Sequence, residues 1–496
     1  MEKEFKDLLA KIQQYNPRAD LTKIRSAFEF AGEAHIGQRR LSGDPVISHP
    51  LAVASFLASW KLDTDCLVAG LLHDVIEDGG KTSEQLEKKF GPTVALLVNG
   101  VTKIGDIKLQ GPRQEVFVEN LRKMIVVMAR DLRVVLIKLA DRYHNMSTLS
   151  FLPLEKQTRI ANETLEIYAP LAERLGIGEM KGKLEDLSFP YCFPEDYQWV
   201  KDYSENYFYQ AEEKIEKAIS QVEKVLAKEK IEVSVGGRKK YLYSLWRKLL
   251  RPEIDKDITK IYDLMALRVI TGSIRDCYAV LGIIHLLWKP VPYIGIRDFI
   301  AQPKPNGYRS IHTNVFGPEG KIMEIQIRTI AMHDQAENGI ASHWFYAETK
   351  KKGALDKDLQ SGVFTPDEKL GWVKQLVFWQ NEMVDSQEFL EALKVDALHH
   401  RIFVFSPKGD VFDLPAEATP VDFAFTVHGG LGEKAIGAKV DGRMVSLDAK
   451  LKSGQMVEIL TDEKRKGPSA DWLNFVITTA AKRQIRKSLK RERNKI

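Results

Sequence analysis

The segment 69–79, AGLLHDVIEDG, places one imidazole and three carboxylates close together in an otherwise apolar stretch. Residues three or four apart share one face of a helix, so a helix here would put His73 over Glu77 and Asp74 over Asp78. Buried carboxylates need a partner such as a cation. A solvated helix face gives the same pattern, so the segment alone leaves both interpretations open.

Two segments far away in the chain carry matching residue types. Residues 40–50, RLSGDPVISHP, place His49 before a proline that can begin a helix, and residues 137–146, IKLADRYHNM, place Asp141 and Asn145 on one helix face. Three separated segments of this composition are much stronger support for a site than one histidine–aspartate pair.

The expected metal site takes nitrogen and oxygen ligands from these segments, namely His49, His73, Asp74 and Asp141. A mixed set of this kind suits a divalent ion such as manganese, and zinc, iron and cobalt are also compatible with it. Glu77 and Asp78 are then placed to orient and deprotonate a water molecule. The three segments together predict metal-dependent hydrolysis.

A second group of polar residues suits the binding of nucleotide phosphates. Residues 237–248, GRKKYLYSLWRK, are expected to place Arg238, Lys240, Arg247 and Lys248 at the start of a helix, where cations and backbone amides bind phosphate. A basic surface face is the alternative. The chain has no Walker lysine loop and no GxGxxG, so scattered groups would hold the nucleotide.

Two acids and one loop complete this second group. Asp263 opens a predicted strand and Glu324 lies within another, and carboxylates on strands can hold Mg²⁺ against phosphates. The loop 304–313, KPNGYRSIHT, offers Tyr308 as a flat surface for a base. Its cationic groups Lys304, Arg309 and His312 are available to phosphates.

Periodicity indicates the elements that position these residues. Apolar residues recur at helical spacing from residue 21 to about 187, which predicts a helical bundle interrupted by a polar loop at 100–113. A charged helix at 207–229, with the helix 156–175 as its partner, should connect this bundle to a domain with strands. The expected strands of that domain are 231–235, 264–270 and 321–328. A third unit has predicted strands at 401–406, 411–414, 439–445 and 456–460 around a helix at 420–427, the order of a ubiquitin-like sheet.

Composition agrees with several folded domains. The chain has 496 residues, with 44% hydrophobic and 28% charged, which excludes a disordered protein. Cys66, Cys192 and Cys277 lack the paired spacing of a disulfide framework or a zinc ribbon. No signal-peptide pattern or membrane span is found, so we expect a cytoplasmic protein without a membrane partner. The basic segment 481–496 is either a solvated helix or a surface for RNA.

The motifs HDVIED, LADRYHNM, GRKKYLYS, NGYRSIHT, EIQIRT and HDQAENGIASHW, in this order, resemble the long Rel/SpoT family, the enzymes that make and destroy the alarmone (p)ppGpp. The resemblance covers nearly the whole chain and implies a multidomain α and α+β protein. The implied domains are an all-α HD-type hydrolase at 1–195, an α+β nucleotidyltransferase-like synthetase with connecting helices at 196–350, a helical linker at 351–399, a small β-grasp TGS domain at 400–462 and a basic helical tail at 463–496.

For the first domain the resemblance implies Mn²⁺-dependent removal of pyrophosphate from the 3′ position of (p)ppGpp, giving GDP or GTP. His49, His73, Asp74 and Asp141 match the family's metal ligands, and Glu77 and Asp78 match the pair that activates water. The residues that match substrate contacts are Arg40, Asn145 and Thr148.

For the second domain the resemblance implies transfer of pyrophosphate from ATP to the 3′-hydroxyl of GDP or GTP in the stringent response. Asp263 and Glu324 match the Mg²⁺-binding and catalytic acids, with Glu324 as the base, and Tyr308 matches the residue that stacks on guanine. The other implied substrate-binding residues are Arg238, Lys240, Ser244, Lys248, Lys304, Asn306 and His312. In the TGS domain, His428 matches a histidine that contacts the tRNA tail, which implies uncharged tRNA and the ribosome as partners.

Two alternatives to a bifunctional enzyme remain open. The chain has Gly295-Ile296-Arg297-Asp298 where bifunctional members typically carry Arg-x-Lys-Asp, so a hydrolase-dominant enzyme with a weak or regulatory synthetase site is one. A tRNA or ribosome sensor with vestigial catalytic units is the other. If both reactions do run, the helices between 165 and 229 should make them mutually exclusive, because the two together would cycle futilely.

Overall fold

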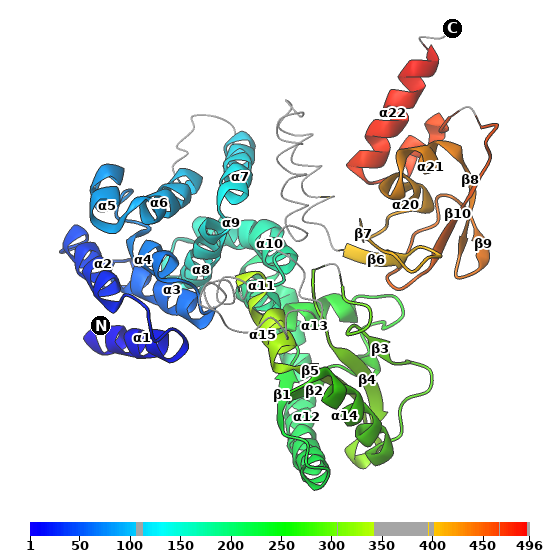
Figure 1. Ribbon diagram of the computed structural model, residues 1–496, viewed down its shortest axis with the longest axis horizontal. Coiled ribbons are helices and arrows are strands. Elements are labelled where there is room, and N and C mark those ends of the chain that lie inside the picture. The colour runs from blue at the N-terminus through cyan, green and yellow to red at the C-terminus, as the bar shows by residue number, and fades with distance from the viewer. Residues whose placement is uncertain (106–112, 305, 342–394, 396–400, 466, 494–496) are drawn as a thin grey trace. The chain divides into compact units, whose positions relative to one another are not determined.

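The computed structural model describes residues 1–105, 113–304, 306–341, 395, 401–465 and 467–493 (Figure 1). The chain divides into two compact units, one formed by Met1–Gln110 with Lys123–Lys369 and the other by Gly111–Arg122 with Leu370–Ile496. The predicted linker 351–399 lies outside the described residues except for residue 395. Among the described residues, no helix combines the length and the apolar character needed to cross a membrane.

The first unit begins with a helical bundle, as the apolar periodicity predicts. Its helices are α1 (Glu2–Tyr15), α2 (Leu21–Ala34), α3 (Ser48–Ser59), α4 (Thr64–Leu72), α5 (Ser83–Phe90), α6 (Pro92–Gly105), the part of α7 (Arg113–Arg130) from Lys123 on, and α8 (Arg133–Ser147). The central helix is α4, because every residue from Cys66 to Leu72 is buried and α2, α3, α6 and α8 all pack against it. The predicted loop 100–113 is helical up to Gly105, and residues 106–112 are outside the described part.

The predicted helix at 69–79 is wrong beyond Leu72, because α4 ends there and residues 73–78 form turns. The amide of Val75 donates to the Leu72 carbonyl at 3.1 Å, which is a tighter connection than that of an α-helix. The chain then packs closely against α2, since a Cβ on Gly79 would lie 3.0 Å from the Cβ of Ala34. The acidic pair therefore sits on a turn and not on a helix face.

A helical connector follows the bundle. It consists of α9 (Leu154–Glu163), a π-helical turn (Thr164–Tyr168), α10 (Ala169–Arg174), α11 (Gly178–Cys192) and α12 (Pro194–Lys228). The predicted helix 207–229 is thus part of a longer one of 35 residues. Gly176, with φ +76°, makes the sharp turn between α10 and α11.

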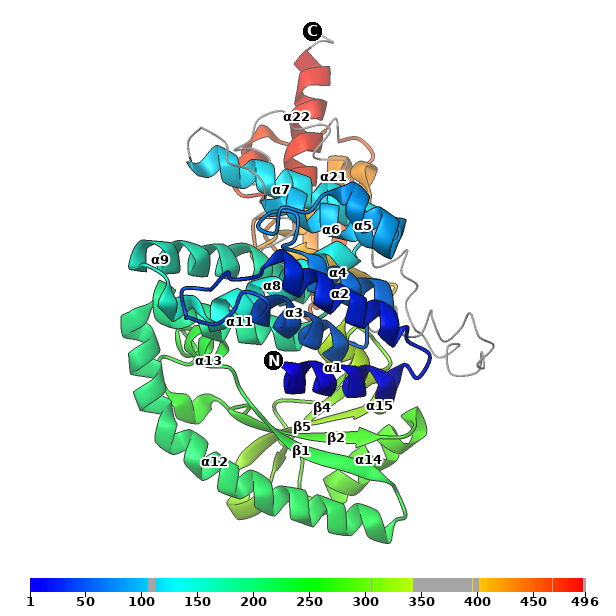
Figure 2. The ribbon, with the colours of Figure 1, turned by 90° about the vertical axis from the view of Figure 1, so that its left-hand side faces the viewer.

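A five-stranded mixed sheet forms the rest of this unit (Figure 2). Its strands are β1 (Val233–Lys239), β2 (Met265–Thr271), β3 (Arg297–Asp298), β4 (Ile311–Phe316) and β5 (Ile322–Thr329), in the order β1-β2-β5-β4-β3. Only β2 and β5 are parallel. Its helices are α13 (Leu242–Leu249), α14 (Ile274–Leu287) and α15 (Ile330–Asn338). Ile325 and Ile327 pack with α12 and α14 on one face, so the alternating Glu324, Gln326 and Arg328 belong to the other.

Two predicted positions in this sheet are wrong. Residues 237–239 do not begin a helix, because they pair with β2 as the end of β1, and α13 starts only at Leu242. Arg238 therefore lies on a strand. Asp263 lies two residues before β2 and not within it.

The second unit contains the predicted ubiquitin-like elements. They are β6 (Arg401–Phe405), β7 (Val411–Pro415), α20 (Pro420–Val427), α21 (Gly429–Lys434), β8 (Ala435–Val440), β9 (Arg443–Val445), β10 (Val457–Thr461) and α22 (Thr479–Arg493). The predicted strand 439–445 is a hairpin of β8 and β9, because Asp441 and Gly442 adopt positive φ angles of 50° and 79°. Asp422 is fully buried and accepts bonds from Thr419 and Thr478, which ties the start of α22 to α20.

Candidate active sites

The histidine and aspartate residues from three distant segments converge in the helical bundle. Nε2 of His49 lies 3.1 Å from Nε2 of His73 and 3.2 Å from Oδ1 of Asp141. Asp74 joins them, with Oδ1 3.1 Å from Nε2 of His73 and Oδ2 3.5 Å from Nε2 of His49. The ligand atoms of His49, His73 and Asp141 all lie within 4.8 Å of one another, and all three residues are buried. Two imidazoles and two carboxylates so arranged fit a divalent cation.

Electrostatics in this cluster favour negative carboxylates. Burial works against charge, but Asp74 raises the pKa of His73 to about 9, and His73 lowers the pKa of Asp74 to about 2. Burial lowers the pKa of His49, which keeps its imidazole neutral as a metal ligand requires. The cluster therefore holds two ionised acids beside a protonated His73, whose imidazole releases its proton when it binds a cation.

Residues around the cluster orient its ligands. Lys138 Nζ contacts Oδ2 of Asp141 at 2.8 Å, and the Asn145 amide donates to Oδ1 of Asp141 at 2.5 Å. His144 lies with Nδ1 2.8 Å from Nδ1 of His49, and burial together with His49 lowers the pKa of His144 to about 4. Sequence reasoning missed both residues, although His144 lies within the LADRYHNM motif and Lys138 directly precedes it.

The predicted substrate contacts of this site also come together. Arg40 Nη2 donates to Oδ1 of Asn145 at 3.1 Å and to Oγ1 of Thr148 at 3.2 Å. Because Asn145 also binds Asp141, these residues form a polar surface that continues directly from the metal cluster. Arg40 brings a cation to this surface from a loop more than a hundred residues away in sequence.

The predicted water-activating pair lies on the exposed turn after Asp74. Glu77 and Asp78 are both exposed. The carbonyl of Asp78 accepts a bond of 3.0 Å from Nε2 of Gln38, whose Oε1 lies 2.8 Å from Nδ1 of His35. Gln38, held by His35 at the end of α2, thus fixes the position of this turn. Nothing in the sequence pattern indicated this role.

In the sheet domain, Asp263 is held by two lysines that the sequence had singled out. Its Oδ2 lies 2.6 Å from Nζ of Lys240, and its Oδ1 lies 2.8 Å from Nζ of Lys248. Although burial raises the pKa of Asp263, the two lysines lower it below its usual value. The predicted residue Ser244 points elsewhere, with its hydroxyl 3.4 Å from Oε2 of Glu185 on α11.

Glu324 lies in the middle of β5 and is surrounded by donors. Arg297 Nη2 contacts its Oε1 at 2.5 Å, His312 Nδ1 lies 3.1 Å from the same oxygen, and Gln326 donates to Oε2 at 2.9 Å. Burial raises the pKa of this carboxyl, but the bonds from His312 and Gln326 and the charge of Arg297 hold it well below its usual range. Arg297 comes from the segment in which the sequence departs from the family pattern.

The loop that precedes β4 is ordered by its own side chains. The Tyr308 hydroxyl lies 2.8 Å from Nε2 of His312, and Oδ1 of Asn306 accepts from the Tyr308 amide at 3.1 Å. Nζ of Lys304 sits 5.0 Å from the Tyr308 ring centroid. Arg309, by contrast, donates to the Ile300 carbonyl at 3.3 Å.

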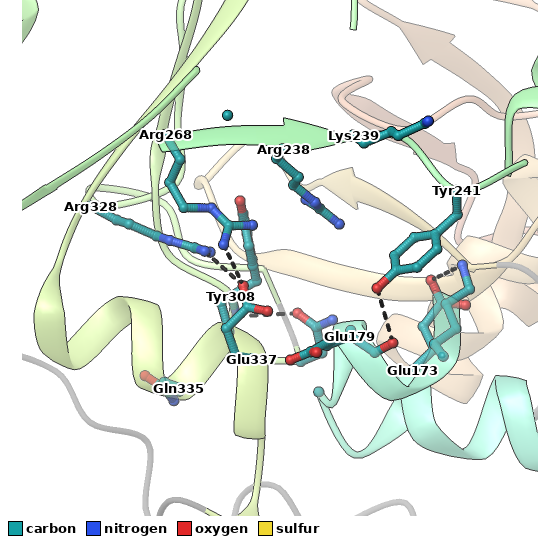
Figure 3. A pocket seen from close by; sticks show the side chains of 16 residues that line it. Glu173, Glu179, Arg238, Lys239, Tyr241, Arg268, Tyr308, Arg328, Gln335 and Glu337 are labelled. Carbon is teal, nitrogen blue, oxygen red and sulfur yellow. Dashed lines mark hydrogen bonds and ion pairs between the residues drawn. The ribbon is translucent and has the colours of Figure 1, made fainter. Parts of the chain in front are cut away.

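A cavity of about 340 Å³ lies beside this loop (Figure 3). It is lined by Glu173, Gly176, Gly178, Glu179, Lys181, Gly237, Arg238, Lys239, Tyr241, Arg268, Asn306, Tyr308, Arg328, Gln335, Ala336 and Glu337. The structure therefore brings the predicted residues Arg238, Asn306 and Tyr308 to one cavity. Sequence reasoning missed Arg268, which also lines this cavity and contacts Glu337 at 3.1 Å.

In the second unit, His428 is exposed between α20 and α21. Its Nδ1 accepts a bond of 3.1 Å from the Gly430 amide, so the imidazole caps the short helix α21.

Comparison with known proteins finds matches to three domains and to long relatives. An HD domain matches residues 27–178, a region found in RelA / SpoT proteins matches 237–351, and a TGS domain matches 402–461. The GTP pyrophosphokinase of Myxococcus xanthus is 46% identical over 483 residues, which are 97% of this chain and 62% of that protein. The bifunctional (p)ppGpp synthase/hydrolase RelA of Mycobacterium tuberculosis is 44% identical over 98% of this chain and 65% of its own length.

The bifunctional (p)ppGpp synthase/hydrolase SpoT of Escherichia coli K12 is 44% identical over 486 residues, covering 98% of this chain and 67% of that protein. The chain is thus a multidomain α and α+β protein with an HD domain, which implies a divalent metal at the histidine–aspartate cluster. It belongs to the Rel/SpoT family, and the family and fold class predicted from the motifs are confirmed. The chain spans about three fifths of the length of the first relatives it matches.

Proposed function

We propose that the chain carries two opposed activities on the alarmone (p)ppGpp. One removes the 3′-pyrophosphate to give GDP or GTP, and the other transfers pyrophosphate from ATP to the 3′-hydroxyl of GDP or GTP. The convergence of His49, His73, Asp74 and Asp141 carries the proposal, because no packing need explains three buried polar side chains with a fourth, half-buried carboxylate beside them. The names of the relatives, which include both a synthase/hydrolase and a GTP pyrophosphokinase, support the pair of reactions.

In the hydrolase, His49, His73, Asp74 and Asp141 would hold Mn²⁺. The ion supplies Lewis-acid polarisation of the phosphoryl group and makes a nearby water more acidic. Lys138 and His144 fix the orientation of Asp141 and His49. A carboxylate of Glu77 or Asp78 accepts the proton of the attacking water, and Arg40 with Asn145 and Thr148 binds the substrate.

In the synthetase, Asp263 would hold Mg²⁺, which neutralises phosphate charge on ATP. Lys240 and Lys248 bind Asp263 in this structure. When ATP binds, its triphosphate would take the place of Asp263 as the anion that these two lysines contact. Glu324 takes the proton of the attacking 3′-hydroxyl. Glu324 is a weak base while Arg297 and His312 bind it, because they lower its pKa. The pKa of Glu324 would rise, and Glu324 would become a stronger base, when substrate phosphates bind Arg297 and His312 instead.

A second candidate is an enzyme dominated by hydrolysis. The close pairing of Arg297 with Glu324 supports it, because the catalytic acid is then neutralised by the chain itself. An assay for AMP formed from ATP and GDP separates this candidate from the first.

The TGS domain is proposed to bind uncharged tRNA on the ribosome through His428. The exposure of this imidazole and the basic residues of α22 support the proposal. A gel-shift assay with deacylated tRNA would show weaker binding by the His428→Ala variant. Equal binding by the two proteins would contradict this role.

Both enzymatic proposals are tested with purified protein and chromatography of the nucleotides. Incubation of ppGpp with Mn²⁺ should give GDP and pyrophosphate, and incubation of ATP and GDP with Mg²⁺ should give AMP and ppGpp. Stable ppGpp in the first assay would refute the hydrolase, and absence of AMP in the second would refute the synthetase.

A further inference from the structure

The cavity beside the 304–313 loop is completed by helices that precede the synthetase sheet in sequence. A Cβ on Gly176 would lie 3.3 Å from the carbonyl oxygen of Asn306, so the α10–α11 turn touches this loop. The Ile340 amide also donates to the Leu175 carbonyl at 2.9 Å, which fixes the turn against the end of α15. Side chains of α10 and α11 therefore form part of the wall opposite the sheet.

Two of these side chains form an ion pair at the cavity. Oε1 of Glu173 lies 3.1 Å from Nζ of Lys181, and both residues line the cavity that also contains Tyr308 (Figure 3). Burial opposes charge on Lys181, but Glu173 and Glu185 raise its pKa, so its ammonium group stays protonated. Lys304, which stacks on Tyr308, feels the charges of both Glu173 and Lys181. The pair thus lies close to the proposed base-stacking residue.

This pair matches the hydrogen-bonding edge of guanine. Guanine presents the N1–H and N2–H donors beside the O6 acceptor, whereas adenine presents an amino donor beside an acceptor nitrogen. A carboxylate accepts two N–H groups, and an ammonium group donates only. A carboxylate adjacent to an ammonium can therefore accept from both N1–H and N2–H of guanine while the ammonium donates to O6. Adenine offers the carboxylate its single amino group, so guanine forms one hydrogen bond more.

We infer that Glu173, supported by Lys181, reads the guanine base of the pyrophosphate acceptor while Tyr308 stacks on it. The inference rests on the proposed synthetase function. It assigns base selection to a helix on the hydrolase side of the chain, so the acceptor site is incomplete without α10. The ligand it requires is a purine with an amino group at C2.

The test compares GDP with IDP, which lacks the C2 amino group, by titration calorimetry. Wild-type protein should bind GDP about tenfold more tightly than IDP, the size of one hydrogen bond to a charged group. In Glu173→Gln the affinity for GDP should fall to that for IDP, while the affinity for ATP stays unchanged. Glu179→Gln is the matched control, because Glu179 lines the same cavity but pairs with Lys183 at 2.5 Å. It should discriminate as the wild type does.

Equal binding of GDP and IDP by the wild type would overturn the inference. So would full discrimination by Glu173→Gln, or a loss of ATP affinity in that variant. Thermal melting checks that each variant is folded. The calorimetry measures binding without turnover. Failure to form AMP in the separate activity assay would refute the synthetase, whereas the comparison of GDP with IDP tests base recognition alone.

Discussion

The two candidate sites differ in what surrounds their acidic residues. In the helical bundle, Asp74 and Asp141 lie beside two imidazoles in an arrangement that fits a cation, and one oxygen of Asp141 also contacts Lys138 at 2.8 Å. In the sheet domain, Asp263 is neutralised by Lys240 and Lys248 from the chain itself. Glu324 is likewise covered by Arg297 and His312. Under the proposed function, the first site would hold its metal before substrate arrives, whereas the second would become competent when phosphates compete for its cations.

Under the proposed function, this difference keeps the two opposed reactions apart. A metal bound at the first site would leave the hydrolase ready for substrate, so its control would act on substrate access or on the 73–78 turn. The synthetase would depend on nucleotides to redistribute its own charges. Each site can therefore be disabled separately, and the following predictions use that separation.

The largest effect is expected from Asp74→Asn. Loss of a charged metal ligand removes several kcal/mol of transition-state stabilisation, so hydrolysis of ppGpp should fall about 10⁴-fold. Synthesis of ppGpp by the same preparation serves as the control and should not change. Hydrolysis within tenfold of the wild type would show that Asp74 is not part of the reaction centre.

Glu324→Gln should lower synthesis about 10³-fold, since the variant cannot accept the proton of the 3′-hydroxyl. AMP release is the measurement, and ppGpp hydrolysis should match the wild type. If synthesis is retained, another group is the base, and the charge rearrangement proposed around Glu324 is unnecessary.

His144→Ala should weaken Mn²⁺ binding about 10- to 100-fold, because His49 loses the partner that orients its ring. Titration with Mn²⁺ gives the dissociation constant. The matched control is His285→Ala, which removes an imidazole that contacts Thr313 in the sheet domain. Equal affinities in the two variants would mean that His144 does not support the metal site.

The last prediction concerns the contact between α11 and the start of α13. Asp186 on α11 accepts bonds from the amides of Leu242 at 3.1 Å and Tyr243 at 2.9 Å, and burial raises its pKa from 3.8 to about 6. The folded state therefore keeps a proton that the unfolded chain releases, so stability falls as pH rises from about 4 to 6. The change is at most about 3 kcal/mol.

Melting temperatures of the wild type and Asp186→Asn at pH 4 and pH 7 test whether the pKa of Asp186 is raised in the folded protein. The wild type should lose stability relative to the variant between these two values. A difference that does not change with pH would show that Asp186 titrates normally in the folded protein.

Sequence reasoning found the chemical groups more readily than their supports. Residue type was enough to single out His73 and Asp141, which the structure brings together in one buried cluster, although the predicted helical spacing fails beyond Leu72. Gln38 and His144 carry no such signal, since their roles arise from contacts with a backbone carbonyl and a ring that only the folded chain brings near.

Local conformation accounts for the remaining errors. The sequence of residues 237–239 suits a helix start, yet pairing with β2 draws these residues into a strand. The acidic pair at 77–78 was predicted to lie on a helix, but α4 ends at Leu72 and the chain turns before Gly79 packs against Ala34. In both cases tertiary contacts override the local preference.

Titration of chelator-treated protein with Mn²⁺ in the absence of nucleotide tests the central claim most directly. We predict one tight site per chain in the wild type and in Glu324→Gln, and loss of that site in Asp74→Asn. A tight site that survives in Asp74→Asn, or that disappears in Glu324→Gln, would contradict the distinction between a metal-ready hydrolase and a synthetase that holds its acids with its own cations.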